Sequence, residues 1–106
     1  MASQGISVSV EQDRAIVRLD GEHEAYTADK LAKSLSALLA EAAPVTVDLR
    51  HAAFIDSTVL GVLLGARGRA AEAGLDFVLL LGDETGWPVR RILDVTGLRS
   101  QFDVVG

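Results

Sequence analysis

The chain contains no cysteine among its 106 residues. A disulfide within it, a thiol nucleophile and a cysteine metal site are therefore excluded. The only other strong metal-binding side chains, two histidines, stand apart at His23 and His51. Neither has the closely spaced partner that a metal motif requires. We therefore expect no metal and no other cofactor.

Basic residues are also scarce relative to acidic ones. Ten Lys and Arg stand against 15 Asp and Glu, which gives a formal net charge of −5 at pH 7. General binding to nucleic acid or to an anionic membrane depends on a basic patch. This balance therefore predicts that the chain binds neither nucleic acid nor membrane. A basic or neutral protein is the partner that the charge favours.

Long hydrophobic runs are missing as well. The longest, Val59 to Ala66, is followed by Arg67 and Arg69 and falls short of the roughly 20 apolar residues that span a bilayer. Nothing at the N-terminus combines a basic region with an apolar run in the manner of a signal peptide. These absences predict a cytoplasmic protein, and the length of 106 residues predicts a single domain, 1–106. Because aromatic residues make up only 5% of the chain, its core is expected to be aliphatic.

Two stretches near the N-terminus alternate apolar and polar residues. The apolar members are Ile6, Val8 and Val10 in the first stretch and Ala15, Val17 and Leu19 in the second. A period of two residues is typical of a strand with one buried face. The short polar segment 11–13 separates them, so the pattern predicts a pair of antiparallel strands.

The middle of the chain changes to helical spacing. Apolar residues recur at this spacing from Leu31 to Ala42, and Pro44 ends the predicted helix. A strand from Val45 to Leu49 follows. A second helix is predicted from about Thr58 to Ala73, because Gly74 is typical of the position after a helix.

The last third alternates again between strand and helix patterns. Phe77 to Leu81 is almost entirely apolar and predicts a strand buried on both faces. A third helix begins near Pro88 and ends at Gly97, and a short strand around Val104 closes the chain. The order β-β-α-β-α-β-α-β predicts an α/β fold with a mixed, mostly parallel sheet covered by helices.

The segment Asp56-Ser57-Thr58 precedes the second helix. Backbone N–H groups in the first turn of a helix lack partners and carry partial positive charge, so an anion is stabilised there. A phosphoryl group on Ser57 would add about −1.5 to −2 charges and could reverse how this surface meets a partner. Helix-start statistics favour a simpler interpretation, in which these residues only cap the helix.

Three glycines, Gly61, Gly65 and Gly68, share one face of the second helix. Each costs about 1 kcal/mol relative to alanine, so a compensating reason is expected. We expect close packing of this face against the sheet or another helix, with ligand binding as the alternative. Leucine at Gly61 or Gly65 should then damage folding by overcrowding.

Enzyme motifs are absent from the sequence. It has no Gly-x-Ser-x-Gly elbow, no phosphate-binding Gly-x-x-x-x-Gly-Lys-Ser/Thr loop and no His-Glu-x-x-His helix. His51 lies six residues before Ser57, but the predicted connection between them gives no reason to expect an aligned nucleophile and base. We therefore predict that the chain is not an enzyme.

Several segments together resemble the STAS domain, and within that family the bacterial anti-sigma factor antagonists. They are Leu19-Asp20-Gly21-Glu22, Val47-Asp48-Leu49, Phe54-Ile55-Asp56-Ser57-Thr58, Leu60-Gly61-Val62-Leu63-Leu64 and Val89 to Leu98. The resemblance covers nearly the whole chain, and the Asp-Ser segment is its most specific part. It implies a switch in which the unmodified protein binds an anti-sigma factor, often an ATP-binding serine kinase, and so frees a sigma factor. That kinase then phosphorylates the antagonist.

By position, the resemblance implies that Ser57 is the phosphoacceptor. The implied partner-binding residues are Asp56, Thr58, Val59 and Leu60, together with Glu22, Glu24 and Tyr26 from the loop after the second strand. The implied partners are an ATP-bound serine kinase and a PP2C-type phosphatase that reverses the modification. The protein is expected to be a monomer or a weak dimer.

Two positions depart from the family pattern. Val59 stands where glycine is common, and a β-branched residue is expected to stiffen and fill the exposed first turn of the helix. His23 replaces leucine and is expected at the exposed rim, where it could respond to pH. In having valine at the position of Val59, the chain also resembles the STAS domains of stressosome proteins. A scaffold in a stressosome-like assembly, or a docking subunit of a transporter, therefore stays an alternative.

Overall fold

The computed structural model describes residues 5–106. Its elements are β1 (Gly5–Glu11), β2 (Arg14–His23), α1 (Ala25–Ala40), β3 (Val45–Asp48), β4 (Ala52–Ile55), α2 (Ser57–Glu72), β5 (Phe77–Leu80), α3 (Trp87–Val95), the short 3-10 helix η1 (Leu98–Gln101) and β6 (Asp103–Val105). Every strand and helix predicted from periodicity is present. The structure adds β4, which periodicity did not mark.

The sheet has the order β1-β2-β3-β5-β6, and β4 pairs separately with β2. β1 and β2 are antiparallel, whereas all the other pairs are parallel. β2 is 10 residues long and pairs with two strands in succession. Its first part, Ala15 to Arg18, lies beside β3, and its last part, Gly21 to His23, lies beside β4. This divided pairing brings β4 to the end of the molecule where α1 and α2 begin.

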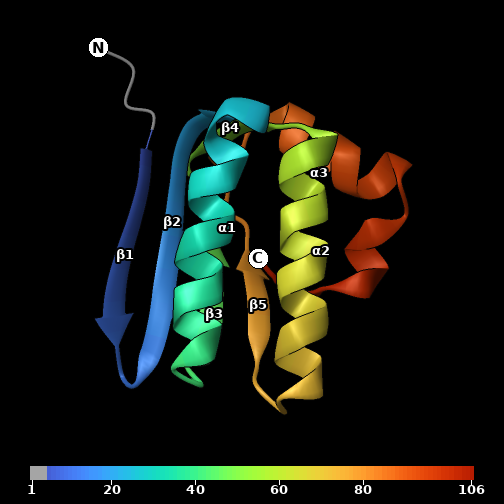
Figure 1. Cartoon of the computed structure of the whole chain (residues 1–106). Coiled ribbons are helices and arrows are strands. Elements are labelled where there is room, and N and C mark those ends of the chain that lie inside the picture. Colours follow the sequence, from blue (N-terminus) through green and yellow to red (C-terminus); the bar gives the residue numbers. More distant parts are fainter. Residues whose placement is uncertain (1–4) are drawn as a thin grey trace.

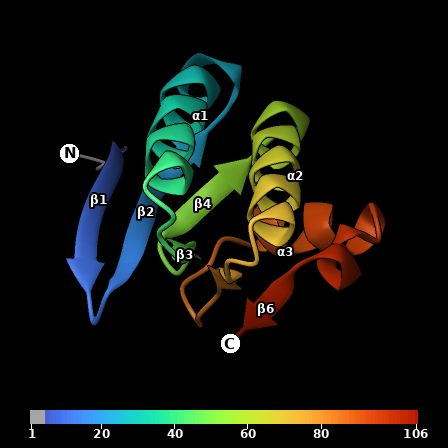
Figure 2. The ribbon, with the colours of Figure 1, turned by 60° about the horizontal axis from the view of Figure 1, so that its bottom comes forward.

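The helices α1 and α2 pack next to each other over one face of the sheet (Figures 1 and 2). The core between sheet and helices is aliphatic, as the composition predicts. Its fully buried side chains include Val17, Leu19, Leu31, Leu35, Val47, Leu63 and Leu79. α3 lies beyond α2 and contacts β4.

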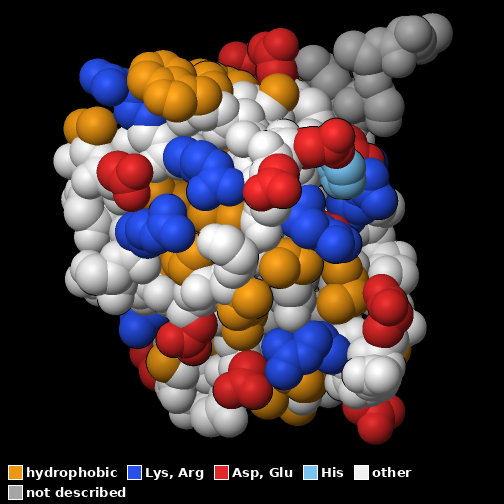
Figure 3. All heavy atoms as spheres, turned by 180° about the vertical axis from the view of Figure 1, so that it is seen from behind, with side chains coloured by type: hydrophobic (Ala, Val, Ile, Leu, Met, Phe, Trp, Pro, Cys, Tyr) orange, Lys and Arg blue, Asp and Glu red, His pale blue; other side chains and the backbone are white. Residues whose placement is uncertain are grey.

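The opposite face of the sheet is not covered by these helices, and charged and hydrophobic side chains are interspersed across the molecule from that side (Figure 3). Val78 and Leu80 on β5 are only partly buried there. The prediction that the strand from Phe77 to Leu81 is buried on both faces is therefore wrong. An apolar parallel strand usually has helices on both sides, but here α1 and α2 lie on the same side.

The glycines of α2 do not serve close packing. A Cβ atom added at Gly61, Gly65 or Gly68 would meet no atom within 4 Å. The first two are exposed and line a shallow hollow of about 140 Å³ between α1 and α2. The packing interpretation of these glycines is therefore wrong, and the expected overcrowding by leucine loses its basis.

Candidate functional site

Two strand-to-helix junctions lie beside each other at one end of the molecule (Figure 1). β2 leads into α1, and its parallel neighbour β4 leads into α2. Because parallel strands end at the same edge of a sheet, both helices begin at that edge. The exposed N–H groups of two helix N-termini therefore concentrate partial positive charge there.

Asp56 connects the two junctions. Its Oδ1 accepts a hydrogen bond from the backbone N–H of Val59 at 2.9 Å, which caps α2. Its Oδ2 accepts from the backbone N–H of Ala25 at 3.1 Å, the first residue of α1. One carboxylate thus satisfies a free donor at each helix start. The predicted cap is present, and it reaches a second helix that the local sequence did not indicate.

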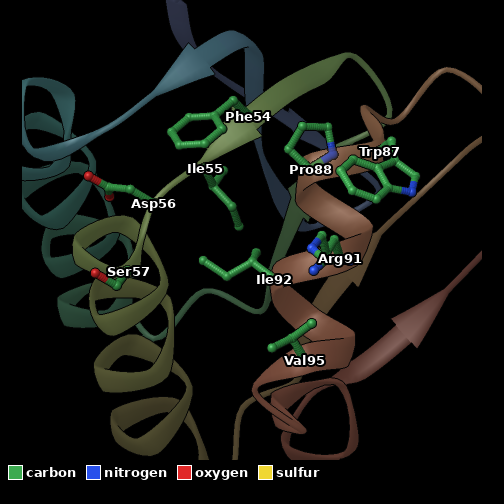
Figure 4. Close-up of a pocket in the computed structure, with 9 residues that line it drawn as sticks. All are labelled: Phe54, Ile55, Asp56, Ser57, Trp87, Pro88, Arg91, Ile92 and Val95. Atoms are coloured by element: carbon green, nitrogen blue, oxygen red, sulfur yellow. The ribbon is translucent and has the colours of Figure 1, made fainter.

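Ser57 is the first residue of α2 and is exposed. No hydrogen bond engages its hydroxyl within residues 5–106, so the oxygen is open to solvent beside the Asp56 carboxylate (Figure 4). Thr58 is exposed as well. The structure therefore brings together, at an accessible helix start, the predicted phosphoacceptor and two of its predicted neighbours. That Ser57 accepts a phosphate stays a prediction.

Val59 and Leu60 are core residues. Their exposed fractions are 0% and 3%, since the turn of the helix directs their side chains away from Ser57 and Thr58 and into the interior. The prediction that these two side chains contact a partner is therefore wrong. So is the expectation that Val59 fills an exposed first turn.

The junction between β2 and α1 lies next to the start of α2, but it is not the loop that was expected, since Glu22 belongs to β2, Tyr26 belongs to α1 and only Glu24 stands between them. Glu22, Glu24 and Tyr26 are all exposed, and Tyr26 is 93% exposed. The hydrogen bond from Ala25 to Asp56 holds this junction against the start of α2. Its role in partner binding stays a prediction.

His23 lies inside the protein, with only 1% of its surface exposed. Its Nε2 is 2.9 Å from the carbonyl oxygen of Asp20, and because a carbonyl only accepts, Nε2 carries the hydrogen. Its Nδ1 lies 3.1 Å from the hydroxyl oxygen of Thr27, which donates to the carbonyl oxygen of Glu24. The expectation of an exposed rim histidine is therefore wrong. The buried ring, on the last residue of β2, instead links this strand to the first turn of α1.

A groove that sequence reasoning missed lies beside Ser57. It encloses about 430 Å³ between the start of α2, β4 and α3, and is lined by Phe54, Ile55, Asp56, Ser57, Trp87, Pro88, Arg91, Ile92 and Val95. Figure 4 shows the α3 side chains opposite Asp56 and Ser57. The available signal was the four-residue spacing of Trp87, Arg91 and Val95, which places them on one face of the predicted third helix.

Gly86 fixes the position of α3 beside this groove. Its N–H donates to the carbonyl oxygen of Ala52 at 2.8 Å. A Cβ atom at Gly86 would overlap the carbonyl oxygen of Ala53 on β4. The chain therefore needs glycine here for close backbone approach, which holds the start of α3 against β4.

His51 lies at the opposite end of β4 from Ser57, and its Nδ1 is 3.1 Å from Glu84 Oε2. It therefore does not form a nucleophile–base pair with Ser57. Within residues 5–106, no cluster of three or more metal-binding side chains occurs. In the same range, no helix has the length and apolar character needed to cross a membrane.

Sequence comparison finds relatives of nearly full length. The anti-sigma-B factor antagonist of Bacillus subtilis (strain 168) is 28% identical over 101 residues, which cover 93% of this chain and 90% of the relative. The protein of the same name from Listeria monocytogenes is 29% identical over 104 residues, which cover 93% of this chain and 88% of the relative.

Solved structures share the fold. An anti-sigma factor antagonist from Mycobacterium paratuberculosis has a TM-score of 0.82 at 23% identity, with 97% of this chain and 86% of the other covered. SpoIIAA, an anti-sigma factor antagonist in its unphosphorylated form, has a TM-score of 0.75 at 17% identity, with 96% and 88% covered. The model of the STAS domain family matches residues 6–105. The chain therefore belongs to the STAS domain family.

Proposed function

We propose that this protein is an anti-sigma factor antagonist, a protein-binding module without enzymatic activity that is switched by phosphorylation of Ser57. It binds an anti-sigma factor of the serine kinase type and so releases a sigma factor for transcription. The observation that carries the proposal is the exposed Ser57 hydroxyl in the first turn of α2, next to the Asp56 cap. The names of the full-length relatives support the same function.

The switch follows from local charge. Unmodified Ser57 can pack against the partner with its polar groups paired. A phosphoryl group adds about −1.5 to −2 charges, which must then be desolvated at the interface. The neighbouring Asp56, Glu22 and Glu24 already make this end acidic. A partner surface that carries carboxylates or bound nucleotide phosphates would therefore be repelled, and the complex would dissociate.

The partner chemistry follows from the same switch. An ATP-bound serine kinase acts both as the bound anti-sigma factor and as the enzyme that ends the complex by modifying Ser57. A PP2C-type phosphatase restores the binding form. We propose that the protein meets both partners in the cytoplasm and acts there as a monomer or weak dimer.

The proposal is tested by a pull-down from lysate of the native cell with unmodified protein and Mg-ATP, followed by mass spectrometry. We expect recovery of a kinase-like anti-sigma factor, with phosphate on Ser57. Ser57→Ala should keep binding, whereas Ser57→Glu should weaken it at least tenfold, because the carboxylate imitates part of the phosphate charge. Ser9→Glu on β1, also exposed, adds the same charge away from the junction and should bind normally. Equal affinity of the wild type and all three variants would contradict the switch.

The scaffold alternative was suggested by Val59, whose side chain is buried. This departure from the family pattern therefore does not change the exposed surface. Recovery of other STAS proteins or of a transporter in the pull-down, with Ser57 unmodified, would favour a scaffold in a stressosome-like or transporter assembly.

A further inference from the structure

The exposed face of α3 carries large apolar side chains next to the Ser57 site. Trp87 is 66% exposed and Val95 is 70% exposed. Arg91 lies between them along the helix, with its guanidinium carbon 5.2 Å from the centroid of the Trp87 ring. Tryptophan and arginine are the residues most enriched among those that dominate binding energy at protein interfaces. An exposed pair of this kind, stacked in advance, is a candidate anchor for a partner.

The groove beside these residues is continuous with the proposed phosphorylation site, Ser57. Asp56 and Ser57 line it on one side, and Trp87 and Arg91 line it on the other (Figure 4). A partner that contacts the Ser57 hydroxyl therefore also reaches the groove. Its volume of about 430 Å³ is sufficient for a large apolar side chain and its neighbours.

The groove exists before any partner binds. Gly86 holds the start of α3 against β4 through its hydrogen bond to Ala52. Val89 and Leu93 on the inner face of α3 are fully buried. Because the groove walls are already ordered, little conformational entropy is lost when a partner binds there.

The charge of Arg91 at the rim of the groove indicates which group a bound partner carries there. Arg91 has no carboxylate within 4 Å among the described residues, and its guanidinium faces solvent over the indole. An aspartate or glutamate on a partner would find a free guanidinium there.

We propose that this groove is the second half of the anti-sigma factor docking surface. It receives an apolar side chain of the anti-sigma factor against Phe54, Ile92 and Trp87, while an adjacent carboxylate of that partner pairs with Arg91. The inference rests on the proposed function, because the partner that reaches the groove is the one that contacts Ser57. Phosphorylation of Ser57 then places a dianion at the rim of the same groove and opposes entry of the partner's carboxylate.

The test uses the full chain and the purified anti-sigma factor recovered by the pull-down, with affinity measured by calorimetry. Trp87→Ala should weaken binding about 30-fold, the loss typical of a dominant interface residue. Arg91→Glu should weaken it at least about tenfold, since it replaces attraction by repulsion. Val10→Ser, which alters another exposed apolar residue (72% exposed), should change affinity less than about twofold. Lys33→Glu repeats the charge reversal on α1, at a side chain that is 79% exposed. It should also change affinity less than about twofold. Thermal melting of every variant establishes that each is folded.

Two further readouts separate docking from chemistry. In the kinase reaction, Trp87→Ala should raise KM for the antagonist and leave kcat for Ser57 phosphorylation unchanged, because the groove lies outside the reacting groups. Trp87 is the only tryptophan of the chain, so its fluorescence reports directly on the groove. Complex formation should shift its emission to the blue and protect it from acrylamide.

The outcomes distinguish the two proposals. If Trp87→Ala and Arg91→Glu bind normally while Ser57→Glu still weakens the complex, the groove inference is overturned and the proposed function stands. If the wild type binds no anti-sigma factor, both fail. If Trp87→Ala abolishes self-association but not anti-sigma factor binding, the groove holds a second copy of the chain and the inference is again overturned.

Discussion

The carboxylate of Asp56 accepts hydrogen bonds from the first turns of two helices. Both bonds join a charged acceptor to a backbone donor, and such bonds contribute more than neutral ones. The consequence for Ser57 is direct, because a phosphate there stands next to this carboxylate and competes for the same N–H groups. At the scale of single residues, the modification is therefore expected to loosen the bond to Ala25 as well as to change surface charge.

Asp56→Ala should lower the free energy of unfolding by about 2 kcal/mol, the upper end for loss of an N-cap, because donors on both helices lose their acceptor. Urea denaturation measures this change. Hydrogen exchange of the Ala25 amide should accelerate in the variant. Thr58→Ala is the control, since this exposed side chain makes no hydrogen bond within residues 5–106. Unchanged protection of Ala25 in Asp56→Ala would show that the bond between the helices contributes nothing.

At this scale the sequence predicted the residues of the site better than their connections. The Asp-Ser pair at a helix start follows from local chemistry alone. The bond from Asp56 to Ala25 spans 31 residues and exists only because β2 and β4 pair, so no local pattern could indicate it. His23 did leave a signal, because it continues the inward alternation of Val17 and Leu19 past Gly21.

Two glycines in different elements show how the same substitution should have opposite effects. Gly65→Ala should raise the free energy of unfolding by about 0.5–1 kcal/mol, because alanine is the better helix former and a Cβ atom there meets no neighbour within 4 Å. Chemical denaturation of the purified variant tests this. A loss of stability would mean that α1 and α2 approach each other more closely at this glycine than the structure shows.

Gly86→Ala should lower the free energy of unfolding by about 1–3 kcal/mol, the usual cost of inserting atoms where none fit. The added methyl group overlaps the carbonyl oxygen of Ala53, so α3 must move away from β4. Chemical denaturation measures this change in the free energy of unfolding, with Gly65→Ala as the matched control. Fluorescence of Trp87 should also change, because this residue follows Gly86 directly. A variant as stable as the wild type would disprove the close approach.

At the scale of elements, periodicity located the two N-terminal strands and all three α-helices. β2 and the helices have buried residues at a regular repeat, whereas β1 alternates in sequence but has no buried face, because Val8 and Val10 are exposed. β4 escaped it for a physical reason. The strand has only four residues, two of them alanine, and these have little strand preference of their own. Its conformation comes from pairing with β2, which is a long-range effect. The groove was missed with it, since β4 and α3 form its walls.

On the scale of the whole molecule, the sheet has one covered face and one open face. Asp48 lies on the open face, yet only 3% of its side chain is exposed. Arg50 holds this carboxylate with two side-chain hydrogen bonds of 3.0 and 2.9 Å. These bonds lower the pKa of Asp48 below its ordinary value of 3.8, against the opposing effect of burial.

This lowered pKa predicts how stability depends on pH. The unfolded chain binds a proton at Asp48 more readily than the folded protein does, so the contribution of the pair is complete above pH 3.8. It is lost as the pH falls below that value through the lower pKa of the folded state. Urea denaturation at pH 7 and at pH 3 should therefore show a smaller difference in stability for Arg50→Gln than for the wild type. Arg99→Gln is the control, because its partner Asp94 is 63% exposed and 3.9 Å away. An equal difference in Arg50→Gln and the wild type would contradict this account.

The molecule has two poles of different character. The starts of α1 and α2 meet at one pole, whereas the tight turn between β1 and β2 lies at the other (Figure 1). At that turn Gln12 and Asp13 have left-handed backbone angles, with φ of 53° and 66°, and both are exposed. A dye or a surface tether attached through a cysteine introduced at Gln12 would therefore stand clear of both helix starts. The absence of native cysteines makes such attachment selective, so single-molecule measurements of docking are feasible on an otherwise unaltered chain.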